Sequence, residues 1–173
     1  MDKIIDELVS WLKDNVKEAN SKGVIVGLSG GIDSAVIAGI SKLAFPDTSL
    51  GLIMPIHSII EDEKDALLVS ESLKLNVKKV DLSNTYDNLI NSSINSENTL
   101  AKSNIKPRLR MTTLYYYGQD LAYLVLGSSN KSEFHIGYFT KHGDSGADLL
   151  PLADFTKGEV YELARILNIP EKI

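Results

Sequence analysis

One stretch decides the fold: Gly27-Leu28-Ser29-Gly30-Gly31-Ile32-Asp33-Ser34. Before it, residues 24–27 form a short β-branched run that predicts a strand. After it, residues 34–44 are rich in small and aliphatic side chains and predict a helix. A glycine-bearing turn between a strand and a helix is a common setting for an anion site in α/β proteins. The stretch therefore predicts a phosphate-binding loop.

The chemistry of this loop follows from its residue types. Glycine lets the backbone turn tightly and approach an anion without a Cβ in the way. The following helix presents unpaired N–H groups, and Ser29 and Ser34 add hydroxyl donors. Asp33 would repel a naked phosphate, so its presence predicts a bridging cation such as Mg²⁺. The alternative is a plain tight turn in which Asp33 caps the helix.

The loop differs from the two best-known phosphate motifs. It lacks the Gly-Lys-Ser/Thr ending of a Walker loop, and its glycine spacing does not match the dinucleotide fingerprint. The complete pattern Ser-Gly-Gly-x-Asp-Ser, placed after a strand and before a helix, still favours phosphate binding over a simple turn.

The rest of the chain alternates predicted strands and helices. Short apolar runs predict strands at residues 24–27, 50–54, 77–80, 123–126 and 149–152. Helical patterns cover residues 1–20, 34–44 and 61–73, a segment from the cap Asn104 to about residue 122, and one from the capping box Thr156–Glu159 to about residue 167. Residues 91–103 are rich in Asn and Ser and predict an exposed loop.

This order of elements predicts an α/β fold. We expect a five-stranded parallel sheet with helices on both faces, because continuously apolar strands are buried on two sides. In such sheets ligands bind beyond the carboxyl ends of the strands. The loops after Gly27, Met54, Val80 and Gly127 should therefore line one cleft.

Bulk composition narrows the classes of protein. The chain has 173 residues, 43% of them hydrophobic, which suits one domain with a sizeable core. The net charge of −5 disfavours a nucleic-acid partner. No apolar run approaches a membrane span and the amphipathic start is not a signal peptide, so we expect a cytoplasmic protein without membrane contact. The absence of cysteine excludes disulfides and zinc–thiolate sites.

Several motifs together resemble a known family. The loop at residues 27–34 resembles the pyrophosphate loop (PP-loop) of ATP pyrophosphatases, which cleave ATP between the α and β phosphates. Three further segments, residues 104–112 (NIKPRLRMT), 124–133 (LVLGSSNKSE) and 137–151 (GYFTKHGDSGADLLP), are similar to ammonia-dependent NAD synthetases in the same order. The resemblance implies a Rossmann-like adenine nucleotide alpha-hydrolase fold. It also implies that residues 1–173 are a single domain without the C-terminal segment usual in the family.

The resemblance implies roles for individual residues. Asp33 and Glu133 match the two carboxylates that hold Mg²⁺. The ATP-binding positions would be Gly27, Leu28, Ser29, Gly30, Gly31, Ile32, Asp33, Ser34, Ser128 and Lys157. The positions that contact deamido-NAD would be Arg110, Lys141 and Asp148. Asp33, Asp144 and Lys157 would be catalytic, with Asp144 orienting ammonium and accepting its proton.

The implied reaction is the ATP-dependent amidation of deamido-NAD to NAD, through an adenylated nicotinate, with release of AMP and pyrophosphate. Free ammonia or a separate donor protein would supply nitrogen, because the sequence holds no thiol for a glutaminase. Residues 139–146 are the expected lid over the reacting carboxylate. The family resemblance also implies a homodimer.

Two other functions remain open from the sequence. One is a different PP-loop amidase or ligase, such as a GMP synthetase-like enzyme. The other is a non-catalytic nucleotide-binding module, which would need neither Asp33 nor Glu133. The residues that depart from the family pattern, Pro107, Ser128-Ser129 and Ser145, remove no chemical group from the expected site.

Overall fold

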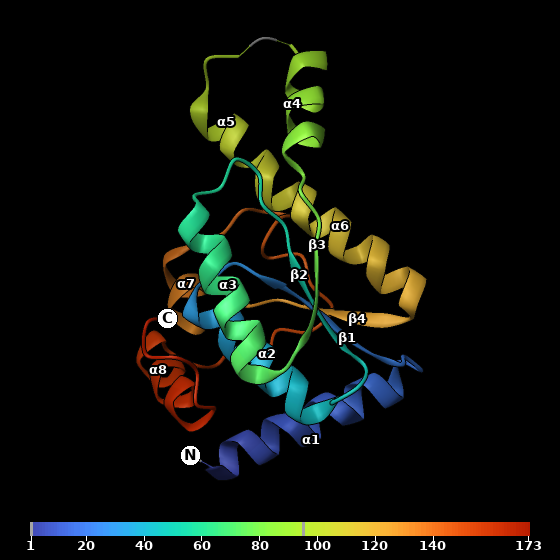
Figure 1. The fold of residues 1–173 in the computed structure, drawn as a ribbon, viewed down its shortest axis with the longest axis vertical. Coiled ribbons are helices and arrows are strands. Elements are labelled where there is room, and N and C mark those ends of the chain that lie inside the picture. The colour runs from blue at the N-terminus through green and yellow to red at the C-terminus, as the bar shows by residue number, and fades with distance from the viewer. Residues whose placement is uncertain (1, 95) are drawn as a thin grey trace.

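The computed structural model describes residues 2–94 and 96–173. At its centre lies a four-stranded parallel sheet in the order β3-β2-β1-β4 (Figure 1). The strands are β1 (Gly23–Leu28), β2 (Ser49–Ile53), β3 (Asn76–Lys79) and β4 (Tyr123–Leu126). The helices are α1 (Asp2–Glu18), α2 (Ile32–Ala44), α3 (Ile60–Leu73), α4 (Ser83–Ser92), α5 (Thr99–Ser103), α6 (Ile105–Leu121), α7 (Lys131–Ile136) and α8 (Lys157–Ile166).

Helices cover both faces of the sheet because successive side chains of β1 point to opposite sides. Val24 and Val26 pack into the cluster formed with α1, α2, α3 and α8. Ile25 packs into a second cluster, in which α6 contributes Leu114. The expected α/β architecture with helices on two faces is therefore confirmed, and β1 is buried between the two cores.

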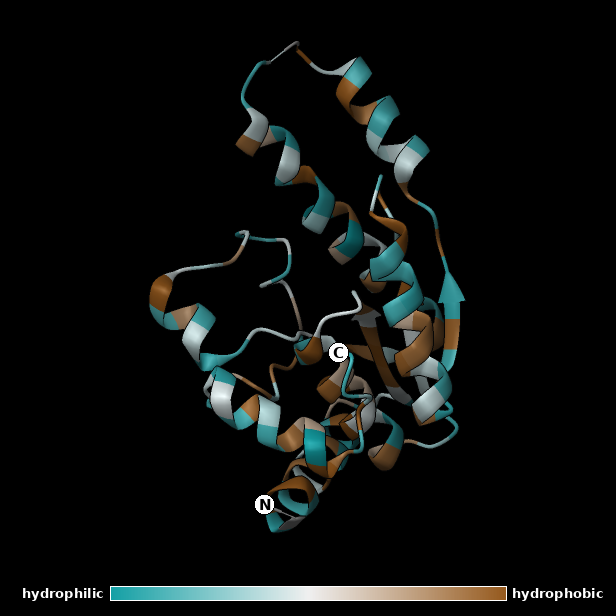
Figure 2. Ribbon diagram, turned by 60° about the vertical axis from the view of Figure 1, so that its left-hand side comes forward, coloured by the Kyte–Doolittle hydropathy of each residue, from teal (hydrophilic) through white to brown (hydrophobic). Residues whose placement is uncertain are grey.

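β3 forms one edge of the sheet and is the most hydrophilic strand (Figure 2). Its four residues are Asn76, Val77, Lys78 and Lys79. Lysines on an edge strand discourage pairing with another chain. The expectation of continuously apolar strands therefore holds for β1, β2 and β4 but is wrong for this edge.

The predicted fifth strand at residues 149–152 is wrong. Leu149 forms one isolated parallel bridge to Leu126, and the Gly127 N–H donates to the Leu149 carbonyl at 2.9 Å. Pro151 has no N–H with which to continue a ladder, and residues 151–154 form turns. The segment touches the sheet beside β4 and then leaves it.

Residues 91–103 are not wholly a loop. α4 extends to Ser92, and α5 begins after Asn98, whose side chain accepts a hydrogen bond from the Ala101 N–H at 3.0 Å. Figure 1 shows α4 and α5 projecting beyond the sheet beside the first turns of α6. The short helix was missed because its five residues are too few to show an apolar periodicity.

Asn104 does not cap α6 as predicted. Its backbone is helical, because α5 runs almost directly into α6, and its side chain makes no cap hydrogen bond. The Asn104 Oδ1 instead accepts a hydrogen bond from the Thr140 hydroxyl at 3.2 Å. By contrast, the capping box of Thr156 and Glu159 at the start of α8 is confirmed.

Across the described ranges, every helix is too short or too polar to span a lipid bilayer.

Candidate active site

A cavity of about 340 Å³ lies at the carboxyl ends of β1, β2 and β4. Its walls come from residues 27–29 after β1, residues 53–55 after β2, residues 58, 62 and 63 around the start of α3, residues 107, 110, 111 and 114 of α6, and residues 126–128, 143, 144 and 146. The expected cleft is thus confirmed for the loops after Gly27, Met54 and Gly127. The loop after Val80 does not line it, because β3 is the far edge strand.

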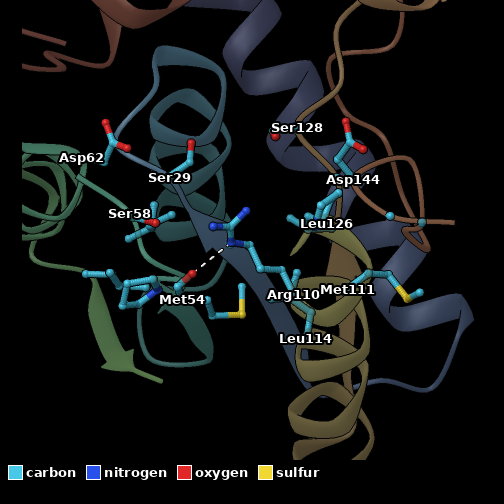
Figure 3. Close-up of a pocket in the computed structure, with 18 of the residues that line it drawn as sticks. Ser29, Met54, Ser58, Asp62, Arg110, Met111, Leu114, Leu126, Ser128 and Asp144 are labelled. Carbon is cyan, nitrogen blue, oxygen red and sulfur yellow. Dashed lines mark hydrogen bonds between the residues drawn. The ribbon is translucent and has the colours of Figure 1, made fainter. Parts of the chain in front are cut away.

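Arg110 places a guanidinium in this cavity. Its Nε donates a hydrogen bond to the Met54 carbonyl, at 2.9 Å, across a separation of 56 residues in the sequence. Burial lowers the pKa of Arg110, and the charge of Asp62 opposes that shift. Figure 3 shows the side chain reaching from α6 toward Met54, with Ser29 and Asp62 on one side and Ser128 and Asp144 on the other. The cavity can therefore hold an anionic group.

The phosphate loop is held by its own hydroxyl groups. The Ser34 hydroxyl donates to the Gly31 carbonyl at 2.8 Å and lies 3.1 Å from the Ser29 hydroxyl. Gly30 has φ of +83°, and a Cβ there would lie 2.6 Å from the Asp62 carbonyl oxygen. Only glycine fits this close left-handed turn.

Asp33 does not cap α2. Gly31 is the cap residue, and no side chain caps the helix, so its first N–H groups are available to an anion. Within residues 27–34, Gly27, Leu28 and Ser29 line the cavity, whereas Gly30 to Ser34 lie outside its wall.

Asp33 instead forms a polar cluster with residues from far along the chain. Its Oδ2 accepts a hydrogen bond from the Lys157 ammonium, and its Oδ1 accepts one from the Asn130 Nδ2 at 2.9 Å. Only 16% of the Asp33 side chain is exposed, against 40% for Lys157. The ion pair is thus partly buried at the N-terminus of α2, with the carboxylate more buried than the ammonium.

Glu133 reaches the same cluster through Asn130. Its Oε2 accepts a hydrogen bond from the Asn130 N–H at 3.2 Å, while the Asn130 Oδ1 accepts one from the Glu133 N–H at 3.1 Å. Burial raises the pKa of Glu133, and the negative charges of Asp33 and Asp144 add to that rise. The structure therefore connects the two carboxylates expected at a metal site, because Asn130 contacts both of them.

The donor set fits Mg²⁺. Carboxylate oxygens are hard ligands, and Mg²⁺ is usually held by one or two of them together with substrate phosphates. Asp33 and Glu133 supply two such groups near the open N-terminus of α2. Among the described residues no group of three or more His, Asp or Glu side chains forms a complete cage, so phosphate oxygens would have to complete the shell.

The remaining predicted residues divide into two groups. Ser128 and Asp144 line the cavity, and the Asp144 Oδ1 accepts a hydrogen bond from the Thr140 N–H at 2.7 Å. Lys141 is exposed and does not line the cavity. Asp148 also lies outside the cavity wall.

Both carboxylate oxygens of Asp148 have partners. Oδ2 accepts the Val125 N–H at 2.8 Å, and Oδ1 accepts the Tyr115 hydroxyl at 2.9 Å. Burial and the bond to Asp148 raise the pKa of Tyr115 to about 12. In this structure Asp148 joins α6 to β4.

Two site residues were missed from the sequence. Asn130 was not assigned a role, although Asn130 and Glu133 have the spacing of a capping box, the signal that found Thr156. Asp62 lines the cavity from the first turn of α3. Its position after β2 could have indicated it, since β2 ends at the same edge of the sheet.

Proteins of one family are similar to this chain along nearly its whole length. The model of the family described as NAD synthase matches residues 4–173. The chain belongs to this family. The NH(3)-dependent NAD(+) synthetase of Finegoldia magna is 52% identical over 171 residues, which cover 99% of this chain and 71% of that protein. The corresponding protein of Carboxydothermus hydrogenoformans is 52% identical over 172 residues, with 97% and 71% covered.

Solved NAD synthase structures share the fold. An NH3-dependent NAD synthetase from Campylobacter jejuni, in complex with nitrate, superposes with a TM-score of 0.93 at 36% identity and covers 99% of this chain and 75% of that one. An NMN synthetase from Francisella tularensis gives a TM-score of 0.95 at 35% identity, with 99% and 72% covered. Family membership favours catalysis over a purely nucleotide-binding module.

Proposed function

We propose that this NAD synthase-family chain makes NAD from deamido-NAD, ATP and ammonia. The observation that carries the proposal is the convergence of three features at one edge of the sheet. These are an uncapped helix behind a glycine loop, two carboxylates joined through Asn130, and a cavity holding the Arg110 guanidinium. We also propose that the chain has the Rossmann-like adenine nucleotide alpha-hydrolase fold that the family resemblance implies.

The first half-reaction activates the substrate. A carboxylate oxygen of deamido-NAD attacks the α-phosphorus of ATP, the bond to the bridging oxygen of the β-phosphate breaks, and pyrophosphate leaves. N–H groups at the start of α2 would stabilise the charge that builds on the leaving group. Lys157, which lies beside Asp33, would contact the phosphates, and Ser128 would donate its hydroxyl to ATP.

Asp33 and Glu133 would hold the magnesium ion. When bound, the ion neutralises phosphate charge and orients the departing pyrophosphate. The two carboxylates lie in the first turns of α2 and α7, the helices that follow the neighbouring strands β1 and β4.

The second half-reaction forms the amide. Ammonia attacks the acyl carbon, the bond between that carbon and the AMP oxygen breaks, and AMP leaves. The attacking nitrogen loses a proton in this step. Asp144, on the cavity wall, is the proposed acceptor of that proton. Residues 139–146 form the proposed lid, which would keep water from competing with ammonia.

Deamido-NAD has two phosphates and a carboxylate, so its site needs cations. Arg110 in the cavity and Lys141 on the exposed loop are the proposed cationic contacts. Asp148 is the third proposed contact and would accept hydrogen bonds from the substrate. We also propose that the protein acts in the cytoplasm as a homodimer, as the family resemblance implies.

A direct assay tests the reaction. The chain is incubated with deamido-NAD, ATP, Mg²⁺ and ammonium, and NAD is measured with an NAD-dependent dehydrogenase. NAD, AMP and pyrophosphate should form in equal amounts, and omission of any one component should stop the reaction. Nicotinate mononucleotide and XMP serve as comparison substrates, the former because one similar structure is an NMN synthetase. Faster amidation of either comparison substrate, or no AMP from any of the three, would refute the proposal.

A further inference from the structure

Asn130 is buried at the junction between β4 and α7, with 1% of its surface exposed. Its side-chain nitrogen donates to the Asp33 Oδ1 at 2.9 Å. Its side-chain oxygen accepts the Glu133 N–H at 3.1 Å, and its own N–H donates to the Glu133 Oε2 at 3.2 Å. Each side-chain polar atom of Asn130 thus contacts a residue that would hold the cation, or the backbone of one.

Asn130 makes these contacts with two separate side-chain atoms, Nδ2 as donor and Oδ1 as acceptor. A helix cap needs an acceptor, which Ser, Thr, Asp and Asn all provide. The contact with Asp33 needs a donor pointing the opposite way, which Asn provides in the same planar group. A cap alone would not explain the amide group here, whereas a cap combined with a hydrogen bond to a carboxylate 97 residues away uses both of its polar atoms.

The contact also limits how Asp33 can bind a cation. The Asn130 amide lies against the Asp33 Oδ1 and the Lys157 ammonium against Oδ2. A cation that displaces the ammonium would therefore meet Oδ2, while Oδ1 stays hydrogen-bonded to Asn130. Mg²⁺ demands near-octahedral geometry with few carboxylates, whereas Ca²⁺ accepts six to eight oxygens and often takes both oxygens of one carboxylate. A carboxylate with one oxygen already hydrogen-bonded favours coordination through the other oxygen alone, and that mode suits the smaller ion.

We propose that Asn130 is a positioning residue that makes the metal site selective for Mg²⁺ over Ca²⁺. It holds Asp33 so that one oxygen binds the ion, and it fixes the position of Glu133 through the two hydrogen bonds of their capping box. The inference rests on the proposed function, because it assumes that Asp33 and Glu133 hold the ion. It goes further in assigning cation choice to a residue that does not itself bind the ion.

The test compares two asparagine caps in the same chain. Asn130→Ser keeps a good cap acceptor but removes the Nδ2 amide group that donates to Asp33, and its shorter side chain has one polar atom in place of two. Asn98→Ser makes the same change at the cap of α5, where the described contact of the asparagine side chain is the hydrogen bond that its Oδ1 accepts from the Ala101 N–H. Binding of Mn²⁺ is measured by electron paramagnetic resonance with α,β-methylene-ATP, and Mg²⁺ and Ca²⁺ are then titrated in as competitors.

We expect Asn130→Ser to weaken Mn²⁺ binding about 10- to 100-fold, as is usual when a residue behind a metal ligand is lost. Its preference for Mg²⁺ over Ca²⁺ should also fall, while Asn98→Ser matches the wild type in both respects. Equal Mg²⁺/Ca²⁺ ratios in wild type and Asn130→Ser would overturn the proposal. So would an equal loss in Asn98→Ser, which would mark a general effect of helix caps.

If Asn130→Ser does not fold, Asn130→Asp replaces it. This variant keeps the shape of the side chain and the cap acceptor. Its added oxygen should lower the preference for Mg²⁺ over Ca²⁺, as Asn130→Ser should. An unchanged preference overturns the proposal. The NAD assay separates the two levels of inference. A wild-type chain that binds Mn²⁺ but makes no NAD refutes the proposed function, while the ratio still judges Asn130.

Discussion

Replacing Lys157 with methionine should raise the affinity of the nucleotide-free protein for a divalent cation. The Lys157 ammonium forms an ion pair with the Asp33 Oδ2, the oxygen that Asn130 leaves for the ion. In the absence of ATP, Lys157 and the cation therefore compete for one carboxylate. Methionine keeps an unbranched stem of similar length beside Tyr161, whose ring lies 5.9 Å from the ammonium.

The magnitude follows from the exposure of the pair. Because 40% of the lysine side chain is exposed, solvent screens the interaction, and about 1 kcal/mol is a reasonable value. Removing that competition should tighten cation binding about fivefold. ATP binding should move the other way, weakening by roughly tenfold or more, because a charge-assisted contact with phosphate is lost.

Two titrations measure these opposite effects. Mn²⁺ binding to the free protein is followed by electron paramagnetic resonance, and ATP binding by calorimetry. Lys131→Met is the matched control, since Lys131 is an exposed lysine at the start of α7, and none of the described side chains forms an ion pair with it. Unchanged or weaker Mn²⁺ binding in Lys157→Met would refute the idea that Lys157 competes with the ion for Asp33.

Three further changes can be checked. Asp33→Asn should abolish Mg²⁺-dependent pyrophosphate release while ATP still binds weakly, and unchanged turnover would remove Asp33 from the metal site. Gly30→Ala should destabilise the fold by about 1–3 kcal/mol in urea, because φ is +83° and the new Cβ would meet the Asp62 carbonyl. Tyr115→Phe should cost about 1 kcal/mol at pH 8. Since the pKa of Tyr115 is raised to about 12, this stabilisation is complete below pH 10 and lost as pH rises through 12, so wild type and variant should converge there.

The sequence was sufficient for the layout of the fold because its signals are local. Short apolar runs placed β1, β2 and β4 within one or two residues, and the spacing of Thr156 and Glu159 placed the start of α8. Parallel strands end at a common edge, so the cleft could be predicted from the order of elements alone.

Two of the errors have local causes, and one omission depends on a long-range contact. Residues 149–152 are apolar enough for a strand, but Pro151 ends the pairing after one bridge. Asn104 has the right residue type for a cap, but the preceding helix already makes its backbone helical. The hydrogen bond from Asn130 to Asp33 could not be predicted from local pattern, since nothing along the chain indicates a partner 97 residues away.

The pairing of β1 with β4 has a consequence for protein synthesis. β1 and the glycine loop emerge early, but the partner strand β4 follows about 100 residues later, after α2, β2, α3, β3, α4, α5 and α6. A nascent chain that has completed β1 to β3 holds the loop and lacks its second carboxylate. Capture of the metal–nucleotide complex would therefore signal that β4 has docked, and could serve as a readout of late folding.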